Sequence, residues 1–469
     1  MAARRGEIVL FTYKHVHFVG IGGIGMSALA RILAGWGVKT SGSDLSLTKL
    51  TDSLAAMGVD IIQGHAANNL APDVDLLVYS SVIRPDNPEY AEAARRGVTI
   101  FCRAELLAEM LKMRRGIAVA GAHGKTTTTG MLGTALLTMQ QQPTIVVGGV
   151  LAAIGTNSCW GGGEYLVAEA DESDGSFLLL PAKVAVVTNV ENDHLDHYGT
   201  MDKLITAFRQ FVEQLPADGL AVLGLDSPIV ADMLPEITAP HVTFALADPA
   251  ADYCAGEITY TDFGTKFMLL HEGQPLGEVE LAVPGAYNVK NALAAAATLH
   301  SLGFAFADIA AGLAAFRGTG RRFELLAENK ARQIRVYDDY AHHPSEIKAL
   351  LDGARHVAKQ RLVVVFQPHR YSRTHLLFDE FAGAFGAADV LILNEIYPAF
   401  EAPIPGVSAE KLAEAVRGRE PKLPVYYAAD QAAVLRTLNE VVQDGDLVLN
   451  VGAGTIRRIG EAYAELIKG

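Results

Sequence analysis

The sequence predicts an α/β protein of three domains, and three observations support this fold class. One glycine-rich loop follows an apolar segment close to the N-terminus, and a second follows another apolar segment near the middle of the first half. Over the last third of the chain, short apolar segments typical of strands alternate with segments typical of helices. A length of 469 residues also suits about three domains. We predict domains over 1–108, 109–319 and 320–469.

The composition argues against several classes of protein. Acidic residues outnumber basic ones by 53 to 39, a net charge of −14, which disfavours a general nucleic-acid-binding surface. We see no apolar run of the ~20 residues that a membrane-spanning helix needs, so we expect no membrane partner. The three cysteines lie far apart without paired spacing, which fits the reducing cytoplasm. Anionic ligands would therefore need local positive sites.

The second glycine-rich loop has the context of a phosphate-binding loop. The apolar residues 117–120 predict a buried strand, Gly121 to Lys125 form a tight turn, and four threonines lead into a helix. Lys125 would lie over the β- and γ-phosphates of ATP, and Thr126 would ligate Mg²⁺. The strict motif has glycine where Val119 stands, so a glycine-rich turn with a surface lysine is the alternative. The predicted ATP-binding residues of this P-loop ATPase-like domain are Gly121, Ala122, His123, Gly124, Lys125, Thr126 and Thr127.

The N-terminal glycine-rich loop predicts a Rossmann-like domain. Residues 15–19 form a predicted strand, the pattern G-x-G-x-x-G starts at Gly20, and Asp44 ends a second strand about 20 residues later. The loop could bind NAD, bind another nucleotide diphosphate, or serve only helix–strand packing. A phosphate loop in the same chain favours a nucleotide-bearing substrate here. The candidate substrate-binding residues are Gly22, Gly23, Gly25, Asp44, Ser80 and Ser81.

Acidic residues and a histidine follow two further strands of the middle domain. A cluster of four carboxylates (Glu169, Asp171, Glu172 and Asp174) follows the strand YLVA, and we select Glu169 as a metal ligand because it comes first. His194 lies among carboxylates after VAVVTNV, where it could ligate a metal, position a reacting group, or belong to an ordinary polar turn. We expect these strand ends to share one edge of a sheet. Asn288 and Asn291 open a later helix, which they could cap, or they could contact nucleotide.

The last third predicts a second Rossmann-like unit after a Gly- and Arg-rich hinge, 318–324. We expect one helix over RTHLLFDEFAGAF, residues 373–385. Polar residues again follow strands, and arginine is suited to bidentate capture of carboxylate or phosphate. Ordinary surface salt bridges are the alternative for any one of them. The residues concerned are Asp338, Asp339, Tyr340, His342, His343, Gln367, His369, Arg370 and Arg373.

Over essentially its whole length, the sequence resembles the Mur ligase family. The segments that carry the resemblance are GIGGIGMSALA, GAHGKTTTT, EADESDGSF, NVENDHLDHYGT, GAYNVKNALAA, RRFE, DDYAHHPSEI, FQPHRYSRT and NEIYPAFEAPIPGVS. The resemblance implies that the first domain binds a UDP-sugar, the second ATP, and the third the incoming amino acid. FQPHRYSRT is similar to members that join L-alanine to UDP-N-acetylmuramate in peptidoglycan precursor synthesis, rather than to those that attach a ready-made tripeptide.

The resemblance also implies roles for individual residues. Lys125 would be the γ-phosphate lysine; the metal ligands would be Thr126, Glu169 and His194. Further ATP contacts would be Asn288, Arg322 and Asp339, to which we add Asn291 from its place at the start of the same helix, and contacts to the amino acid and substrate carboxylate would be Tyr340, His342, Arg370 and Arg373. The implied reaction passes through an acyl phosphate, with ATP and Mg²⁺ as cofactors and UDP-N-acetylmuramate and L-alanine as substrates. The catalytic residues would be Lys125, His194, Asp339 and His342; the sequence does not identify the proton acceptor, for which Asp339 and His342 are candidates.

The sequence departs from the family pattern at four positions. Ala122 replaces a threonine or serine, Tyr287 replaces a histidine that contacts adenine, and Thr455 stands where aspartate is usual. Several family members hold a second Mg²⁺ with a carbamylated lysine, but the corresponding residue here is Phe208, so we do not predict that modification.

Two other functions would explain parts of the sequence. An NAD-dependent oxidoreductase would use the first domain but leave the phosphate loop unexplained, and a P-loop NTPase acting through partners would leave the first domain unexplained. We expect a monomer or a homodimer. The segment 249–285 predicts a β-hairpin-rich insert to which we assign no chemistry.

Overall fold

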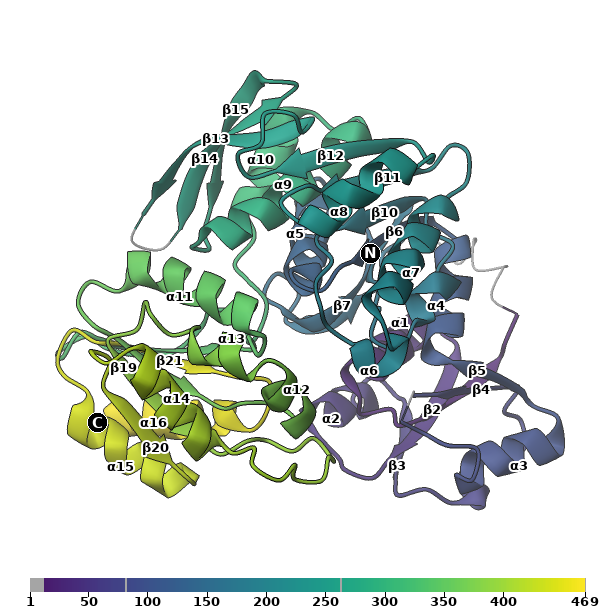
Figure 1. Cartoon of the computed structure of the whole chain (residues 1–469). Coiled ribbons are helices and arrows are strands. Elements are labelled where there is room, and N and C mark those ends of the chain that lie inside the picture. Colours follow the sequence, from purple (N-terminus) through teal and green to yellow (C-terminus); the bar gives the residue numbers. More distant parts are fainter. Residues whose placement is uncertain (1–11, 81, 262–263, 469) are drawn as a thin grey trace. The chain divides into compact units, whose positions relative to one another are not determined.

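The computed structural model describes residues 12–80, 82–261 and 264–468, so Ser81 lies outside the described residues. Contacts divide the chain into two compact units. Unit 1 comprises residues 1–256, 268–279 and 290–316, and unit 2 comprises 257–267, 280–289 and 317–469. Figure 1 labels many of the elements of both units.

The N-terminal part of unit 1 contains a five-stranded parallel sheet in the order β3-β2-β1-β4-β5, as a Rossmann-like domain requires. Its strands are short and apolar, and β1 is buried along its whole length. The elements are β1 (His15–Val19), α1 (Ile24–Gly35), β2 (Lys39–Asp44), α2 (Lys49–Ala55), β3 (Asp60–Gln63), η1 (Ala67–Asn69), β4 (Leu76–Tyr79), α3 (Pro88–Arg96), β5 (Thr99–Cys102) and α4 (Arg103–Lys112).

A second sheet has ten strands, in the order β15-β14-β13-β12-β11-β10-β6-β9-β7-β8. The insert over 249–285 supplies β13 to β15, as its sequence predicted. The elements are β6 (Arg115–Ala120), α5 (Lys125–Thr138), β7 (Thr144–Leu151), β8 (Thr156–Cys159), β9 (Tyr165–Glu169), η2 (Ser176–Leu179), β10 (Val184–Val187), α6 (Leu195–Tyr198), α7 (Met201–Glu213), β11 (Leu220–Gly224), α8 (Pro228–Met233), η3 (Leu234–Glu236), β12 (His241–Ala245), β13 (Tyr253–Tyr260), β14 (Thr265–His271), β15 (Gln274–Leu281), α9 (Ala286–Ser301) and α10 (Phe306–Ala314).

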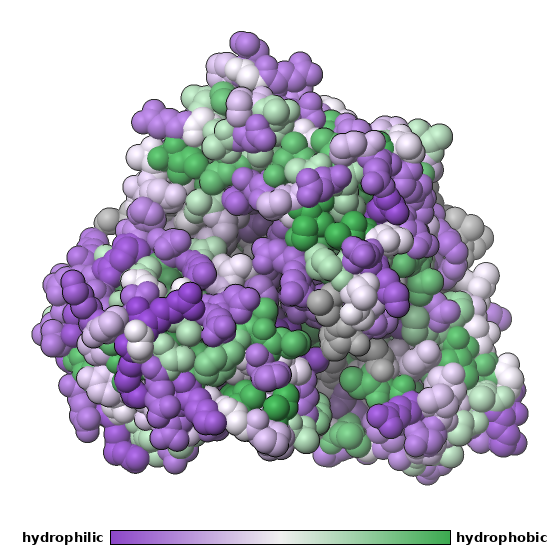
Figure 2. Space-filling view, viewed as in Figure 1, coloured by the Kyte–Doolittle hydropathy of each residue, from purple (hydrophilic) through white to green (hydrophobic). Residues whose placement is uncertain are grey.

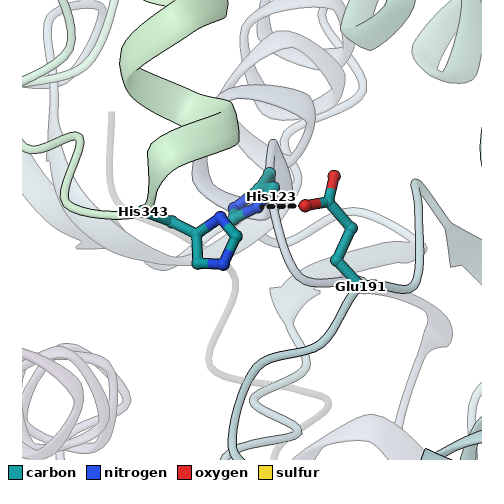
Figure 3. A group of neighbouring side chains, drawn as sticks. All are labelled: His123, Glu191 and His343. Atoms are coloured by element: carbon teal, nitrogen blue, oxygen red, sulfur yellow. Dashed lines mark hydrogen bonds and ion pairs between the residues drawn. The ribbon is translucent and has the colours of Figure 1, made fainter. Parts of the chain in front are cut away.

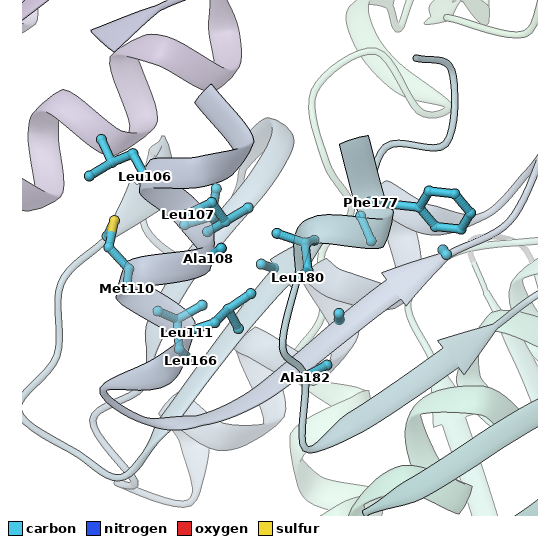
Figure 4. Close-up of a cluster of buried hydrophobic side chains, with 14 of the residues drawn as sticks. Leu106, Leu107, Ala108, Met110, Leu111, Leu166, Phe177, Leu180 and Ala182 are labelled. Atoms are coloured by element: carbon cyan, nitrogen blue, oxygen red, sulfur yellow. The ribbon is translucent and has the colours of Figure 1, made fainter. Parts of the chain in front are cut away.

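The two sheets of unit 1 share a buried core and a polar junction. One cluster of buried apolar residues extends from Val16 to Ile237, and Figure 4 shows the part in which Leu107 and Leu111 of α4 lie near Leu180. At the junction, the Asn157 amide of β8 donates to the Ile24 carbonyl and, over 3.2 Å, to Ser27 Oγ in α1. The first domain is therefore attached to the second by buried hydrogen bonds as well as by apolar packing.

Unit 2 contains a six-stranded sheet in the order β16-β17-β21-β18-β19-β20, in which β16 is antiparallel to β17 and the other pairs are parallel. Separate apolar clusters contain buried residues of this sheet, with Phe366 in one and Val365 in the other, as alternation along β18 requires. The elements are β16 (Glu324–Asn329), β17 (Ile334–Asp339), α11 (Pro344–Val357), β18 (Leu362–Phe366), α12 (Tyr371–Leu376), α13 (Phe378–Ala382), β19 (Val390–Asn394), α14 (Ala409–Arg419), β20 (Val425–Ala428), α15 (Gln431–Val441), β21 (Leu447–Val451) and α16 (Ile456–Ile467).

One predicted element is wrong. The helix expected over residues 373–385 is two short helices, α12 and α13, because Leu377 between them has φ −114° and ψ 27°, outside the helical region. The edge strand β16 was also not predicted, because its apolar run, residues 325–327, is too short to indicate a strand by itself.

Surface features agree with the composition. On the face shown in Figure 2, hydrophilic residues are spread widely, with hydrophobic ones interspersed in small groups. Within 12–468, apart from the gaps at 81 and 262–263, no helix is long and apolar enough to cross a bilayer. Cys102, Cys159 and Cys254 are free thiols.

Candidate active site

The phosphate loop connects β6 to α5 and depends on two glycines. Gly121 has φ +134°, and a Cβ added there would lie 2.1 Å from Thr188 Oγ1, so a side chain does not fit. Gly124 has φ +84°, immediately before α5 begins at Lys125. Val119, which stands where the strict motif has glycine, is fully buried inside β6. The tight turn therefore begins after Val119, which explains this departure.

The segment that follows β10 makes hydrogen bonds to the backbone of the phosphate loop. The backbone N–H groups of Ala122 and His123 donate to the backbone oxygen and to Oδ1 of Asn189, over 3.1 and 2.9 Å, and Thr188 Oγ1 donates to the His123 carbonyl over 2.6 Å. Figure 3 shows His123 Nε2 pointing to the Glu191 carboxylate, 3.2 Å away. Sequence reasoning missed Asn189 because it lies inside the segment VAVVTNV, which we predicted as a strand, whereas β10 ends at Val187.

Thr126 and Glu169 lie together, as predicted. Thr126 Oγ1 donates to the Glu169 carboxylate, 3.0 Å from Oε2, and the same oxygen accepts the Gly148 N–H over 2.7 Å. A hydroxyl and a carboxylate at this spacing are the oxygen ligands that Mg²⁺ uses in proteins.

Lys125 lies against a different carboxylate. Its Nζ donates over 2.7 Å to Oε1 of Glu172 and over 2.5 Å to the Gly121 carbonyl. Burial alone would lower the pKa of Lys125, but Glu172, Asp171 and Glu169 together raise it, so the ammonium stays charged. Glu172 was one of four acids in the predicted cluster and was not selected; only the folded loop distinguishes it from Glu169.

His194 lies beside the same carboxylate. Its Nε2 is 3.8 Å from Glu172 Oε1 and 3.6 Å from Asp193 Oδ2. His194 has φ +59°, a left-handed conformation that is uncommon for residues other than glycine and is often found at functional sites. Burial raises the pKa of Glu172, with Lys125 opposing that effect.

The sheet explains why these residues meet. Strands β10, β6 and β9 are neighbours and run parallel, so their carboxyl ends lie at one edge. The loop after β6 carries Lys125, the end of β9 carries Glu169 and Glu172 follows it, and the segment after β10 carries His194. The predicted convergence of three polar strand ends is therefore confirmed.

The two asparagines of α9 have different surroundings. Asn291 belongs to unit 1, where its Oδ1 accepts from Thr128 Oγ1 over 3.3 Å, so it lies beside the start of α5. Asn288 belongs to unit 2, and its amide donates over 2.7 Å to the Pro284 carbonyl. Asn288 therefore contacts a carbonyl just before the helix instead of capping an N–H group.

The first domain brings several of its predicted residues together. The Gly22 N–H donates over 2.9 Å to Asp44 Oδ2, and the Gly23 N–H donates over 3.2 Å to the Gly20 carbonyl. Ser80 faces this loop, because a Cβ added at Gly20 would lie 3.1 Å from its Oγ. A Cβ at Gly25 would lie 2.9 Å from Cδ of Arg103, at the start of α4. Glycine, acid and serine thus meet at the carboxyl ends of β1, β2 and β4.

The adjacent aspartates Asp338 and Asp339 at the end of β17 have different partners. Arg321 Nε donates over 3.1 Å to Asp338 Oδ2, and Asp338 is fully buried. Asp339 accepts the N–H groups of Phe323 and Ala341 over 2.7 and 2.8 Å, and burial raises its pKa to about 6 against the effect of Arg322.

Tyr340 lies under both hinge arginines. The guanidinium carbons of Arg321 and Arg322 are 4.7 and 5.5 Å from its ring centroid, within the range of cation–π attraction. Arg322 Nη1 is also 3.7 Å from the Glu346 carboxylate.

A basic and aromatic group follows β17 and β18 in unit 2. The rings of His342 and His369 are 6.0 Å apart, and Arg373 Nη1 donates over 3.4 Å to His369 Nδ1. Burial, then Arg373 and Arg370, lowers the pKa of His369 to about 4, which keeps its ring neutral near pH 7.

Arg370 has φ +71°, and its Nη1 is 4.0 Å from Glu401. Tyr340, His342, Arg370 and Arg373 are therefore all near strand ends of one sheet.

The remaining departures have local explanations. Tyr287 packs beside Gly353 of α11, where a Cβ at that glycine would lie 3.0 Å from its ring. Thr455 Oγ1 accepts from the Gln367 amide over 3.2 Å. Phe208 is 1% exposed in α7 and its ring centroid is 5.3 Å from that of Phe177, so it belongs to the core.

Three family models match the chain in succession. "Mur ligase family, catalytic domain" matches residues 15–115, "Mur ligase middle domain" matches 119–299, and "Mur ligase, glutamate ligase domain" matches 321–454. Together they cover most of the sequence.

Similar proteins carry one recurring description. UDP-N-acetylmuramate–L-alanine ligases of Geotalea uraniireducens and Geobacter sulfurreducens are both 49% identical, over 97% and 96% of this chain and 98% and 97% of theirs. The crystal structure of the UDP-N-acetylmuramate-alanine ligase of Thermotoga maritima has a TM-score of 0.83 at 31% identity, covering 97% of this chain and 99% of that one. A murein peptide ligase of Psychrobacter arcticus shares the fold, with a TM-score of 0.70 at 24% identity and coverage of 97% and 98%.

Proposed function

The chain belongs to the Mur ligase family and is an ATP-dependent ligase, and from this premise we propose that it joins L-alanine to the carboxylate of UDP-N-acetylmuramate. The observation that carries the proposal is the convergence of Lys125, the Thr126–Glu169 pair and His194 at three adjacent strand ends. The relatives at 49% identity across almost the whole chain support the choice of substrates. The product would be a peptidoglycan precursor.

The chemistry requires activation of the carboxylate. A carboxylate does not condense with an amine in water, because it is a poor electrophile and its oxygen leaves badly. Transfer of the γ-phosphoryl group of ATP to the carboxylate gives an acyl phosphate and ADP. The neutral amine of L-alanine then attacks the acyl carbon, the C–O bond to phosphate breaks, and an amide and inorganic phosphate result.

The phosphate loop would position the transferring group. Lys125 would neutralise charge on the β- and γ-phosphates, and the loop N–H groups would bind their oxygens. Thr126, Glu169 and His194 would hold Mg²⁺, and the hydroxyl and carboxylate 3.0 Å apart fit that ion. When bound, Mg²⁺ supplies positive charge that offsets the phosphate charge. The further ATP contacts that we propose are Gly121, Ala122, His123, Gly124, Thr127, Asn288, Asn291, Arg322 and Asp339.

The other two substrates would use the remaining strand ends. We propose that Gly22, Gly23, Gly25, Asp44 and Ser80 bind the UDP-sugar, as does Ser81, which lies outside the described residues. Arg370 and Arg373 would bind carboxylate, with Tyr340 and His342 beside them. Because both Asp339 oxygens accept backbone N–H groups, His342 is the better candidate for the proton acceptor of the two.

A phosphate-release assay tests the proposal. The purified protein is given ATP, Mg²⁺ and UDP-N-acetylmuramate, and each amino acid in turn. We expect phosphate release with L-alanine, less with glycine or L-serine, and none without the UDP-sugar. Preference for a tripeptide would assign the chain to the tripeptide-adding branch, and ATP hydrolysis without any co-substrate would favour a P-loop NTPase. Bound nicotinamide, detected by its absorbance, would favour an oxidoreductase.

Two further properties are part of the proposal. A cytoplasmic location suits the free thiols and the nucleotide substrates. A monomer or homodimer remains our expectation, which light scattering at several protein concentrations tests.

A further inference from the structure

Glu172 is a buried carboxylate that the proposed reaction does not yet use. It is 1% exposed, and its Oε1 accepts from Lys125 Nζ over 2.7 Å and lies 3.8 Å from His194 Nε2. Its second oxygen, Oε2, has no hydrogen-bond partner among the residues that the structure describes. A buried carboxylate oxygen without a partner is unfavourable, so this atom indicates a missing positive ligand.

The backbone fixes Glu172 in this place. Its carbonyl accepts from Tyr198 Oη over 2.6 Å and from the Gly175 N–H over 3.1 Å. Tyr198 belongs to α6, which begins one residue after His194. The backbone of Glu172 is therefore held close to His194, and its carboxylate lies against both Lys125 and His194.

Phosphate and Glu172 compete for the same ammonium group. Lys125 Nζ has three acceptors here, Glu172 Oε1 and the carbonyls of Gly121 and Ala122. Of these three acceptors only Glu172 is an anion, so phosphate that binds Lys125 is repelled by it, and it is the acceptor that phosphate would replace at the greatest cost to the loop. Removing one partner of a buried ion pair leaves an uncompensated charge, which is strongly unfavourable.

A divalent cation can replace the charge that Glu172 loses. His194 Nε2 is near enough to Glu172 Oε1 for one ion to contact both, and imidazole and carboxylate are suitable ligands for Mn²⁺ and Mg²⁺. Thr126, at the start of α5, and Glu169, at the end of β9, provide a second pair of ligand oxygens. The residues present therefore fit a cation close to Glu172.

We propose that Glu172 makes nucleotide binding dependent on a divalent cation. The Glu172 carboxylate is the counter-ion of Lys125. When phosphate binds Lys125 in its place, the carboxylate needs a cation beside His194 as its new partner. Glu172 therefore selects cation-loaded nucleotide over free nucleotide. This inference rests on the proposed function, because it takes the loop to bind the phosphates of ATP. Coupling of this kind is reciprocal, so it acts on cation affinity as well as on nucleotide affinity.

Calorimetric titration with ADP, in Mg²⁺ and in EDTA, tests the proposal. The quantity of interest is the ratio of the dissociation constant in EDTA to that in Mg²⁺. We expect Glu172→Gln to reduce this ratio about tenfold, chiefly because ADP binds more tightly without the cation. Asp174→Asn is the matched control, since it removes one charge from an exposed residue of the same loop, and its ratio should equal that of the wild type.

The reciprocal measurement needs no nucleotide. Lys125→Met removes the ammonium that neutralises Glu172, so Mn²⁺ binding to the full chain, followed by electron paramagnetic resonance, should tighten about tenfold. The double variant with Glu172→Gln should lose that gain. An unchanged ratio in Glu172→Gln, or unchanged Mn²⁺ affinity in Lys125→Met, would overturn the proposal.

The two proposals fail in different ways. If the wild type binds no ADP in Mg²⁺, the proposed function is wrong, and the Mn²⁺ measurement alone decides the role of Glu172. If ADP binds with the same ratio in wild type and Glu172→Gln, the role of Glu172 is wrong and the proposed function stands.

Discussion

At the scale of single residues, neighbours of the same type have different roles. Adjacent residues of a strand point to opposite faces, so Asp338 is buried against Arg321 while Asp339 accepts the N–H of Phe323 in the hinge. Similarly, Glu169 faces Thr126, and Glu172, three residues later, faces Lys125. The sequence could predict that an acidic group lies beside the phosphate loop. It could not assign each acid, because a turn of irregular backbone decides where each one points.

Lys125 is the residue whose loss should matter most to the proposed reaction. Lys125→Ala removes the positive charge at the phosphates, so we expect phosphate release to fall on the order of a hundredfold or more, with the circular dichroism spectrum unchanged. Lys183→Ala is the control, because Lys183 pairs with Asp218 in the same unit and has no proposed role. Alanine-dependent release at the wild-type rate in Lys125→Ala would contradict the phosphate-loop assignment.

His369 should remain neutral well below pH 6.5, its ordinary pKa, because its pKa is lowered to about 4 by burial, Arg373 and Arg370. Between these values the unfolded chain binds a proton that the native chain does not, so the native state loses stability as the pH falls. Relative to His369→Gln, the wild type should lose about 2 kcal/mol from about pH 7 to about pH 4.5. Urea unfolding at both pH values measures this difference. Titration of the His369 ring near pH 6.5 by NMR would refute the prediction.

At the scale of elements, strands and helices with strong apolar patterns were predictable, and edges and breaks were not. Strand β6 and helix α5 were found because a buried parallel strand and a helix start have clear signals. The edge strand β16 has exposed side chains, and the break between α12 and α13 lies inside an apolar segment. The strand β16 forms because it pairs with β17, and the break between α12 and α13 follows from packing on the sheet. Neither feature therefore has a clear signal in its own short segment of sequence.

The phosphate loop should tolerate no side chain at Gly121. Gly121→Ala would place a methyl group within 3.0 Å of backbone atoms of Asn189 at φ +134°, so we expect a loss of about 3 kcal/mol or more and of ADP binding. Gly155→Ala is the control, because its φ is also positive, at +66°, but nothing lies within 4 Å. That variant should lose about 1 kcal/mol and bind ADP normally. Urea unfolding and calorimetric titration compare them, and equal losses would show that the contact with Asn189 is unimportant.

At the scale of the whole molecule, the predicted three domains do not correspond to three separate cores. One large cluster of buried residues spans the first two sheets, beside a smaller cluster around Val19 and Leu77 that belongs to the first sheet alone, whereas the C-terminal sheet has its own clusters. The sequence could predict three α/β segments from their alternation. It gave no sign of the shared core, because apolar residues of α1 look the same whether they pack on their own sheet or also on β8.

Calorimetry should therefore show two unfolding transitions. Leu33→Ala in α1 and Leu223→Ala in β11 should lower the same transition, because both side chains belong to the shared cluster. Leu449→Ala in β21 should lower the other one. Each change should cost about 2–5 kcal/mol, as expected for buried leucine. If Leu33→Ala and Leu223→Ala moved different transitions, the first two sheets would be energetically independent.

The buried ring of Phe208 has a consequence for the environment that the protein needs. Where the family resemblance places a lysine that must first react with dissolved carbon dioxide, this chain has a core phenylalanine packed on Phe177. Turnover in gas-purged buffer should equal turnover with added bicarbonate, which a paired rate measurement can check. The activity of this protein would then not depend on the concentration of dissolved carbon dioxide or bicarbonate.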